Sequence, residues 1–152
     1  MSIEKDIHQT KPFVNEYLKA VVNIQYTNSW VLSQLHNLLN EYDVTPQQYN
    51  VLRILSGCKE PVTIMYIKQR MLDQMSDVSR IVERLITKGL VNKEISQKDK
   101  RLVDVSISKD GALLLQEMNL IVHRFNNAFS NITKKEAETL NKLLDKLRYS
   151  AD

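Results

Sequence analysis

A group of arginines and lysines in the middle of the chain has the residue types and spacing that nucleic-acid chemistry requires. Arg80 and Arg84 stand four residues apart, so a helix places both guanidinium groups on one face. A guanidinium can bind the edge of guanine through two hydrogen bonds or hold a phosphate. Lys98, Lys100 and Arg101 lie close together in a polar segment further along. The two groups predict a surface that binds double-stranded DNA.

Each of these residues also has a purely structural interpretation. Glu83 can pair with a neighbour and leave the helix arginines on an ordinary solvated face. A lysine at a hairpin tip can serve only to keep a sheet edge from pairing. Ser76 and Asp77, at the start of the same helix, can meet a phosphate or simply cap the helix. Among these residues, Arg101 is the one for which DNA binding is favoured most over a structural role, because a narrow minor groove attracts a guanidinium group.

The arginines belong to a segment with the period of an amphipathic helix, predicted from Ser76 to Lys88. Steps of about 100° per residue put four apolar residues on one side of this helix. They are Val78, Ile81, Val82 and Leu85. The opposite side carries Ser76, Arg80, Glu83, Arg84 and Thr87.

After this helix the hydrophobic period changes to that of a strand. Gly89 predicts the helix end, because glycine adopts the left-handed conformation of a C-cap at least cost. Residues 91–95 and 102–107 then alternate apolar and polar side chains, which predicts two half-buried strands. Residues 97–100 form a polar turn between them. A helix with a basic face followed by a hairpin with a basic tip is typical of a winged helix-turn-helix.

Two shorter helices are predicted before the basic segment. Residues 45–48, Thr-Pro-Gln-Gln, contain a cap, a proline suited to the first helical position and a capping-box partner. The apolar period of this helix ends near Gly57, and a short helix is predicted from Thr63 to about Leu72. With the basic helix they make a helix-turn-helix arrangement.

Long amphipathic helices are predicted on both sides, from Lys11 to Asn40 and from Ala112 to Ser130, and a second capping box at Thr133 opens a last helix. Their apolar surface exceeds what a small module can cover, which predicts a homodimer. The residues expected to bury the subunit interface are Leu114, Met118, Ile121, Phe125, Leu140, Leu144 and Leu147. The predicted fold is mainly α. An N-terminal dimerisation helix in residues 1–44 and C-terminal dimerisation helices in 111–152 flank a winged helix-turn-helix with a β-hairpin wing in 45–110.

Charge and composition favour a DNA partner in the cytoplasm. The net charge is +3, but residues 59–109 contain eleven Lys and Arg against seven Asp and Glu. This local excess favours a polyanion over a membrane, since no long basic amphipathic helix is present. The first residues contain no apolar signal core, and no run of about 18 apolar residues occurs. A single cysteine, Cys58, agrees with a reducing compartment.

Several short segments follow one another along the chain in a characteristic order. Residues 79–85 read S-R-I-V-E-R-L and residues 88–91 read K-G-L-V; D-K-R at 99–101, V-S-I-S at 105–108 and Gly111 follow. Together they resemble the MarR family of bacterial transcriptional regulators, and the resemblance spans most of the chain. It implies a homodimer in which two winged modules read a pseudo-palindromic DNA site. It further implies a repressor that a small ligand releases from DNA.

The resemblance also assigns roles to residues. The helix from Ser76 to Lys88 would enter the major groove, and Arg101, in the slot of the family's D-x-R motif, would reach the minor groove while Asp99 braces the wing. The turn at residues 72–75 lacks the family's common glycine, and Lys93 stands where an arginine often contacts phosphate. The residues expected to bind DNA are Ser76, Asp77, Ser79, Arg80, Arg84, Thr87, Lys93, Lys98, Lys100 and Arg101.

The family places small ligands between the dimerisation helices and the DNA-binding module. The candidate lining residues are Tyr26, Trp30, His36, Tyr49 and Met118. No cofactor or metal is expected, since the three histidines lack a metal-ligand spacing, and Cys58 is predicted to be a silent thiol rather than a redox switch. No catalytic motif predicts an enzyme. The rival hypothesis is an adaptor that docks proteins on its winged-helix surface, which a lack of salt-sensitive DNA affinity would favour.

Overall fold

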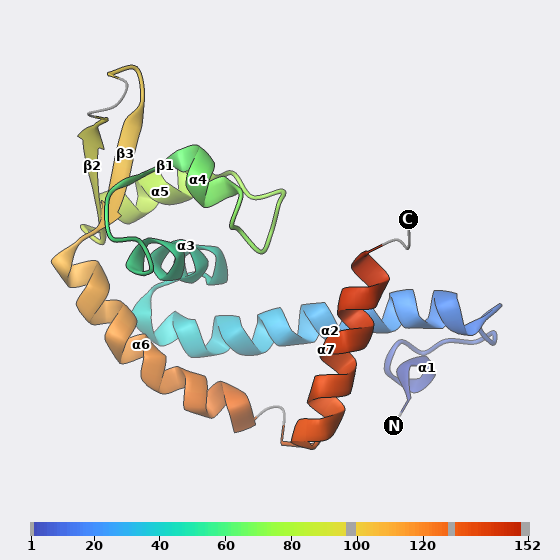
Figure 1. The fold of residues 1–152 in the computed structure, drawn as a ribbon. Coiled ribbons are helices and arrows are strands. Elements are labelled where there is room, and N and C mark those ends of the chain that lie inside the picture. The colour runs from blue at the N-terminus through green and yellow to red at the C-terminus, as the bar shows by residue number, and fades with distance from the viewer. Residues whose placement is uncertain (1, 97–99, 128–129, 150–152) are drawn as a thin grey trace.

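The computed structural model describes residues 2–96, 100–127 and 130–149, the side chains of 121–124 and 126–127 excepted. Figure 1 shows a winged module of short helices and strands, a long helix beneath it, and a C-terminal helix pair that starts at the foot of the wing. The elements in chain order are α1 (Ile3–Asp6), α2 (Glu16–Leu39), η1 (Asn40–Tyr42), α3 (Pro46–Ser56), β1 (Val62–Thr63), α4 (Ile64–Lys68), α5 (Val78–Thr87), β2 (Val91–Ile95), β3 (Val103–Ile107), α6 (Lys109–Asn127) and α7 (Lys134–Arg148).

The wing is part of a three-stranded antiparallel sheet in the order β1-β3-β2. Val91 pairs with Ile107 at the foot of the hairpin and Ile95 with Val103 towards its tip. The first predicted strand is confirmed, and the second begins one residue later than expected. Strand β1, which pairs Val62 with Val105, was not predicted because two residues are too few to show an alternating pattern.

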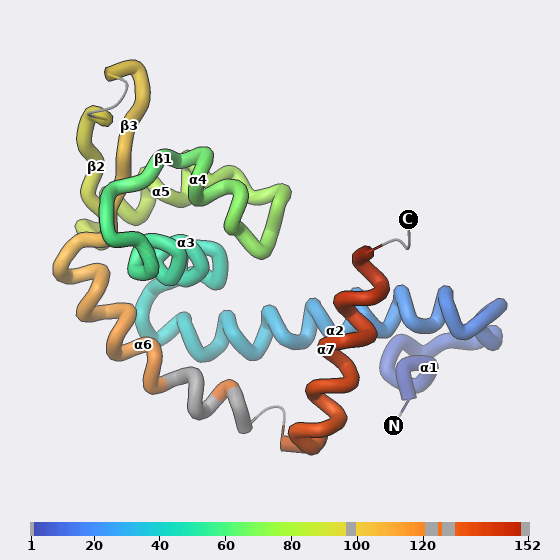
Figure 2. Tube along the Cα trace, in the orientation of Figure 1, coloured from blue at the N-terminus to red at the C-terminus, as the bar shows by residue number. Residues whose placement is uncertain are grey.

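The core lies inside the winged module, which Figure 2 shows above the C-terminal part of α2 and next to the first part of α6. Side chains from α3, α4, α5 and the sheet meet there, and Leu39 of α2 and Leu115 and Met118 of α6 join them. Residues fully withdrawn from solvent include Val51, Leu52, Ile67, Val82, Leu85 and Val105. Met118 is also fully buried, so its expected place at a subunit interface is wrong. The first half of α6 packs on α3 instead.

Helix starts agree with the local sequence. Thr45 Oγ1 accepts a hydrogen bond from Gln48 N at 3.2 Å, and Gln48 Oε1 accepts one from Thr45 N at 3.1 Å. Thr133 and Glu136 form the second predicted capping box, with Thr133 N donating to Glu136 Oε2 at 2.7 Å. This hydrogen bond from the backbone amide lowers the pKa of the Glu136 carboxyl. Both predicted capping boxes are confirmed.

Three helix boundaries differ from the prediction. Helix α2 begins five residues after Lys11, because the Asn15 side chain caps it by accepting from Leu18 N at 2.9 Å. Thr63 caps α4 as expected, but α4 ends at Lys68 rather than near Leu72. Helix α6 begins at Lys109, three residues before Ala112.

Ser108 explains the earlier start of α6, because it caps the helix before Lys109. Gly111 lies in the first turn of that helix, and its amide donates to Ser108 Oγ at 2.9 Å. A Cβ atom at Gly111 would lie only 2.1 Å from the Leu90 carbonyl oxygen. Glycine is therefore required here because two backbones approach closely and not because the chain turns.

The flanking helices expose much of their apolar surface. Tyr17 and Leu18 of α2 are 85% and 50% exposed, and Leu143 and Leu147 of α7 are also exposed. Helix α1 packs beside α2 through the buried Ile3 and an ion pair of 2.6 Å between Glu4 Oε1 and Lys19 Nζ. No helix in the described ranges is long and apolar enough to cross a membrane.

Candidate nucleic-acid interface and ligand pocket

The predicted phase of the basic helix is confirmed in α5. Val78, Val82 and Leu85 face the core and are at most 3% exposed. Four exposed residues make up the opposite side, which we call the outer face of α5: Arg80, Glu83, Arg84 and Thr87. Ser79 is exposed beside them. Because the apolar residues hold α5 against the core, this face is directed away from the module.

The Asp73 side chain stabilises the turn before α5, which lacks the glycine common in the family. Its carboxylate accepts from Met75 N at 3.0 Å and from Ser76 Oγ at 2.8 Å. Asp77 then caps α5, since its Oδ1 accepts from Arg80 N at 3.1 Å. Short polar side chains stabilise such turns by bonding to nearby backbone groups. Ser76 and Asp77 therefore already have structural partners, and their predicted DNA contacts remain predictions.

The other end of α5 is tied to the corner between η1 and α3. Gly89 adopts the expected left-handed conformation with φ of 73°, and Leu90 N donates to Leu85 O at 2.9 Å. Lys88 Nζ donates to the backbone oxygen of Asp43 and lies 2.8 Å from its Oδ2. Sequence reasoning did not identify this pair, because its members lie 45 residues apart.

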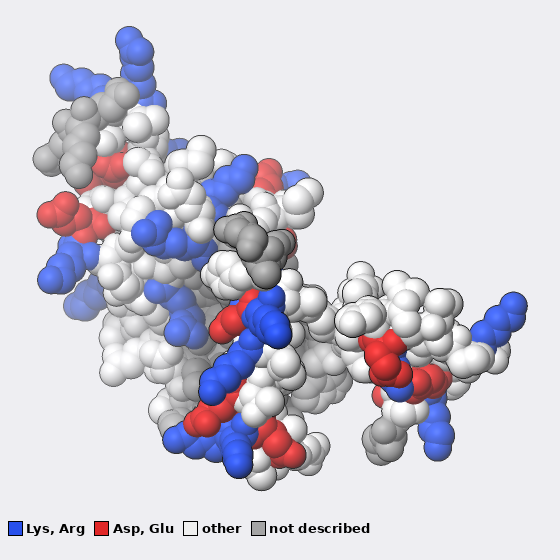
Figure 3. All heavy atoms as spheres, turned by 45° about the vertical axis from the view of Figure 1, so that its right-hand side comes forward, with Lys and Arg blue, Asp and Glu red and all other residues white. Residues whose placement is uncertain are grey.

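The wing projects from the module beside α5 (Figure 1). Lys100 and Arg101 are exposed, and Figure 3 shows Lys and Arg side chains at the tip of the wing. Lys98 and Asp99 lie outside the described residues, so their expected phosphate contact and wing bracing remain predictions.

Lys93, on β2, does not project freely. Its Nζ lies 2.6 Å from Glu83 Oε1, so the outer face of α5 is joined to the wing. In the described part of the chain neither Arg80 nor Arg84 forms an ion pair. Glu83 thus pairs with a neighbour, as the structural alternative supposed, but the pairing leaves both arginines on the exposed face. The predicted phosphate contact of Lys93 competes with this ion pair.

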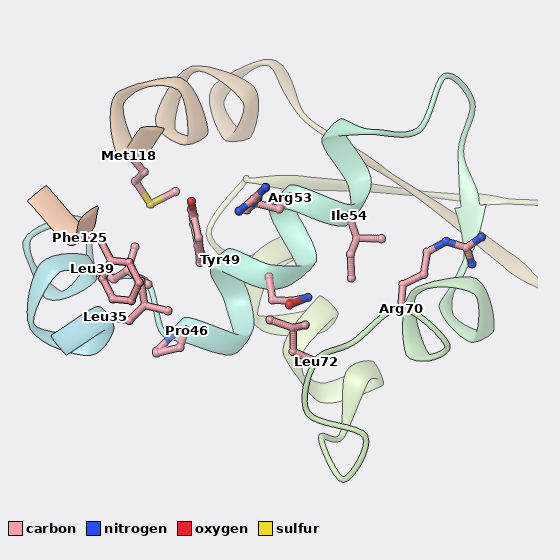
Figure 4. A pocket seen from close by; sticks show the side chains of 11 residues that line it. Leu35, Leu39, Pro46, Tyr49, Arg53, Ile54, Arg70, Leu72, Met118 and Phe125 are labelled. Atoms are coloured by element: carbon pink, nitrogen blue, oxygen red, sulfur yellow. The ribbon is translucent and has the colours of Figure 1, made fainter. Parts of the chain in front are cut away.

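A pocket of about 500 Å³ lies where α2, α3 and α6 meet below the module (Figure 4). Tyr49 and Met118 line it, as two of the five residues expected around a ligand. Tyr26 and Trp30 lie elsewhere on α2, and His36 borders a different hollow beside Arg84 and Thr87. The tertiary packing therefore separates residues that the sequence analysis predicted to line one ligand site.

Arg53 is among the lining residues that the sequence did not predict, and it brings a positive charge to the pocket. Its guanidinium carbon lies 5.9 Å from the centre of the Tyr49 ring, and Figure 4 shows both groups on the same side of the pocket. Arg70 also borders the pocket, but its guanidinium carbon stacks 3.4 Å from the centre of the Tyr66 ring. The four-residue spacing of Tyr49 and Arg53 on α3 was the available signal.

Comparison with known proteins identifies the family. A sequence model of the MarR family matches residues 42–102. The multiple antibiotic resistance protein MarR of Escherichia coli K12 is 30% identical over 116 residues, which covers 72% of this chain and 80% of that protein. This chain belongs to the MarR family.

Further relatives agree with this MarR assignment. The HTH-type transcriptional regulator TcaR of Staphylococcus aureus strain Newman is 29% identical over 137 residues, covering 88% of each protein. The structure of a mutant Escherichia coli MarR complexed with operator DNA superposes with a TM-score of 0.81 at 26% identity, over 91% of this chain and 100% of that one. These relatives are transcriptional regulators, which are not enzymes. The expected family and winged-helix fold are confirmed.

Proposed function

We propose that this MarR-family regulator is a homodimeric, cytoplasmic repressor that binds a pseudo-palindromic operator and leaves it when a small molecule enters the pocket. The outer face of α5 supports this proposal most directly. It presents Arg80, Arg84 and Thr87 to solvent on a helix whose other side is fixed to the core. A helix held in this way can enter the major groove and read base edges.

The wing supplies the second part of the interface. Arg101 and Lys100 are exposed at the end of a hairpin that stands beside α5. A guanidinium at this position suits the minor groove next to the site that α5 reads, because narrow grooves concentrate negative potential. The similar fold of the Escherichia coli MarR mutant that is complexed with operator DNA supports a DNA-binding role for the winged module.

The exposed apolar residues of the flanking helices support the homodimer. Leu140, Leu143 and Leu147 lie on one side of α7 and are 48%, 60% and 65% exposed. A helix with such a face is stable only when the face is covered. A second copy covers it and places two outer faces on two half-sites, whose spacing of about one DNA turn follows from the dimer.

The lining of the pocket supports the proposal that a small molecule regulates the protein. Its wall contains Leu35, Leu39 and Met118 and so suits an apolar ligand, while the guanidinium of Arg53 over Tyr49 provides a partner for an anionic group. We therefore propose small aromatic acids as the effector class. A ligand between α2, α3 and α6 changes the angle at which the winged module sits on the dimerisation helices, and thereby the spacing of the two outer faces.

DNA binding is tested by fluorescence anisotropy with an inverted repeat from the region near the protein's own gene and with a scrambled duplex. The logarithm of the affinity should fall with that of salt by about 0.9 per phosphate neutralised. Arg101→Ala should weaken binding most on sites with A·T-rich flanks. A DNA affinity that does not change with salt concentration would contradict the proposal and favour the protein-docking adaptor.

The effector is tested with benzoate as the simplest aromatic acid. Benzoate should raise the melting temperature and lower operator affinity, and Arg53→Gln should reduce both effects. Lys59→Gln, which removes one positive charge outside this pocket, is the matched control. Equal responses in the two variants would rule out Arg53 as the anion partner.

A further inference from the structure

An acidic residue stands in the middle of a surface that we propose meets the DNA polyanion. Glu83 lies on the outer face of α5, three residues after Arg80 and four before Thr87. Its side chain is 56% exposed, so burial does not explain its presence. A carboxylate there repels phosphate and weakens the attraction that the neighbouring arginines provide.

The partner of Glu83 lies on the wing. Lys93 Nζ approaches Glu83 Oε1 to 2.6 Å, and the Lys93 side chain is 43% exposed. The pair therefore joins the outer face of α5 to strand β2 in a position open to solvent. Exposed ion pairs contribute little to folding stability. The core residues Val82 and Leu85 already hold the helix in place, so the fold does not depend on this pair.

The pair has a direct consequence for DNA binding. While the ammonium group of Lys93 contacts Glu83, it is not available to neutralise a phosphate. The protein thus gives up one phosphate contact for as long as the ion pair persists. A carboxylate on a recognition helix accepts a hydrogen bond from the amino group of cytosine. Adenine also presents an amino group in the major groove, but its N7 acceptor lies beside that group and repels a carboxylate, and guanine and thymine present no donor there.

We propose that Glu83 is a specificity-determining residue that withholds Lys93 from phosphate on non-cognate DNA. On the operator, a cytosine amino group takes the place of Lys93 at the carboxylate, and the ammonium group moves to the backbone. The discrimination lies in this exchange, because cytosine offers its amino group without the neighbouring N7 acceptor of adenine and so best replaces the interaction that Glu83 loses. This inference rests on the proposed DNA-binding function.

The test measures salt dependence on random and operator duplexes for the parent, Glu83→Gln, Lys93→Met and the double variant. On random DNA, Glu83→Gln should bind several-fold more tightly, and its salt dependence should steepen by about 0.9, the value for one added phosphate contact. The gain should be smaller on the operator, so the ratio of operator to random affinity falls. In the Lys93→Met background the same substitution should not steepen the slope.

Glu94→Gln is the matched control. Glu94 is the next residue along β2 and is exposed, so this variant removes an equal charge from the wing without releasing Lys93. The inference is overturned if Glu83→Gln leaves the salt dependence on random DNA unchanged, or if Glu94→Gln steepens it equally. It is overturned as well if Glu83→Gln still steepens the salt dependence in the Lys93→Met background. It is also overturned if Glu83→Gln tightens both duplexes by the same factor.

The parent protein separates these failures from failure of the proposed function. A parent that binds neither duplex, or binds without salt dependence, contradicts DNA binding itself. A parent with ordinary salt-dependent binding and an unaffected Glu83→Gln variant contradicts only the role of Glu83. Circular dichroism checks that all variants are folded.

Discussion

The winged module and the flanking helices contain the same kind of amphipathic pattern but bury it differently. In the module, Leu52, Val82 and Leu85 are fully buried within one chain. In the flanking helices, Tyr17 of α2 and Leu147 of α7 are 85% and 65% exposed. The core of the module is therefore completed within one chain, whereas the outer helices present apolar surface that their own chain leaves exposed and that we propose a second copy covers. An amphipathic period predicts that a face will be buried, but it does not predict which molecule buries it.

The largest expected effect is on assembly. The double variant Leu143→Glu and Leu147→Glu places two carboxylates on the exposed apolar face of α7. Light scattering at micromolar concentration should give about twice the 17.7 kDa chain mass for the parent and a single chain mass for the variant. Operator affinity should fall with dimerisation.

Lys142→Glu provides the control for assembly, because it introduces a carboxylate on the polar side of the same helix. That variant should remain dimeric. A parent protein that is monomeric at this concentration would show that the exposed apolar surface of the flanking helices is not covered by a second copy.

The second largest effect concerns the core of the module. Leu52→Ala should lower the free energy of unfolding by about 2–5 kcal/mol, since it leaves a cavity at a fully buried position. Urea denaturation of the monomeric double variant measures this without a contribution from dimerisation. In the same background Leu140→Ala, at a position 48% exposed, should change stability by about 0.5 kcal/mol or less. Similar losses at both positions would show that α7 packs against its own chain.

A smaller effect separates DNA reading from assembly. Arg80→Ala should weaken binding to a cognate site by about 1–3 kcal/mol if the guanidinium contacts a base, and less on random DNA. The variant should keep the dimer mass, since Arg80 is exposed on the module and not on the flanking helices. Arg148→Ala, which removes an exposed arginine from α7, should leave DNA affinity unchanged. Equal affinities for Arg80→Ala and the parent would exclude Arg80 from the reading surface.

The smallest effect is expected where α1 meets α2. The hydrogen bond from Lys19 is the main cause that lowers the pKa of the Glu4 carboxyl from 4.5 to about 2. Because the pKa is lower in the folded protein, this contact stabilises α1 above pH 4.5 and is lost as the pH falls towards 2. The protection factors of the Lys5 and Asp6 amides, which compare their exchange with that of an unfolded chain at the same pH, should fall over that range, with little change in the module. Exchange that is equally fast in Lys19→Met and the parent at neutral pH would contradict this role.

Much of the fold could be predicted because its determinants are local. Thr45 and Thr133 bond to residues three positions away, and Gly89 ends α5 through its own backbone conformation. The outward direction of Arg80 and Arg84 follows from the period of one helix. The DNA-facing candidates on α5 were therefore accessible to sequence reasoning, although their contacts with DNA remain to be measured.

The remaining features depend on parts of the chain that meet only after folding. Strand β1 exists because β3 lies beside Val62, and Gly111 is needed because Leu90 crosses it closely. The pocket joins Tyr49 and Met118 but leaves out Tyr26 and Trp30, since the packing of α6 on α3 selects the lining.

The two ion pairs at α5 also show which features follow from the local sequence and which depend on the tertiary structure. The order of residues alone determined that the helix has a basic, polar outer side, because a helical period assigns every side chain a direction. It did not determine that Glu83 selects Lys93 or that Lys88 selects Asp43, which is 45 residues away. Charges select partners by distance in space, and only the folded chain brings the wing to the middle of α5 and the η1–α3 corner to its C-terminal end.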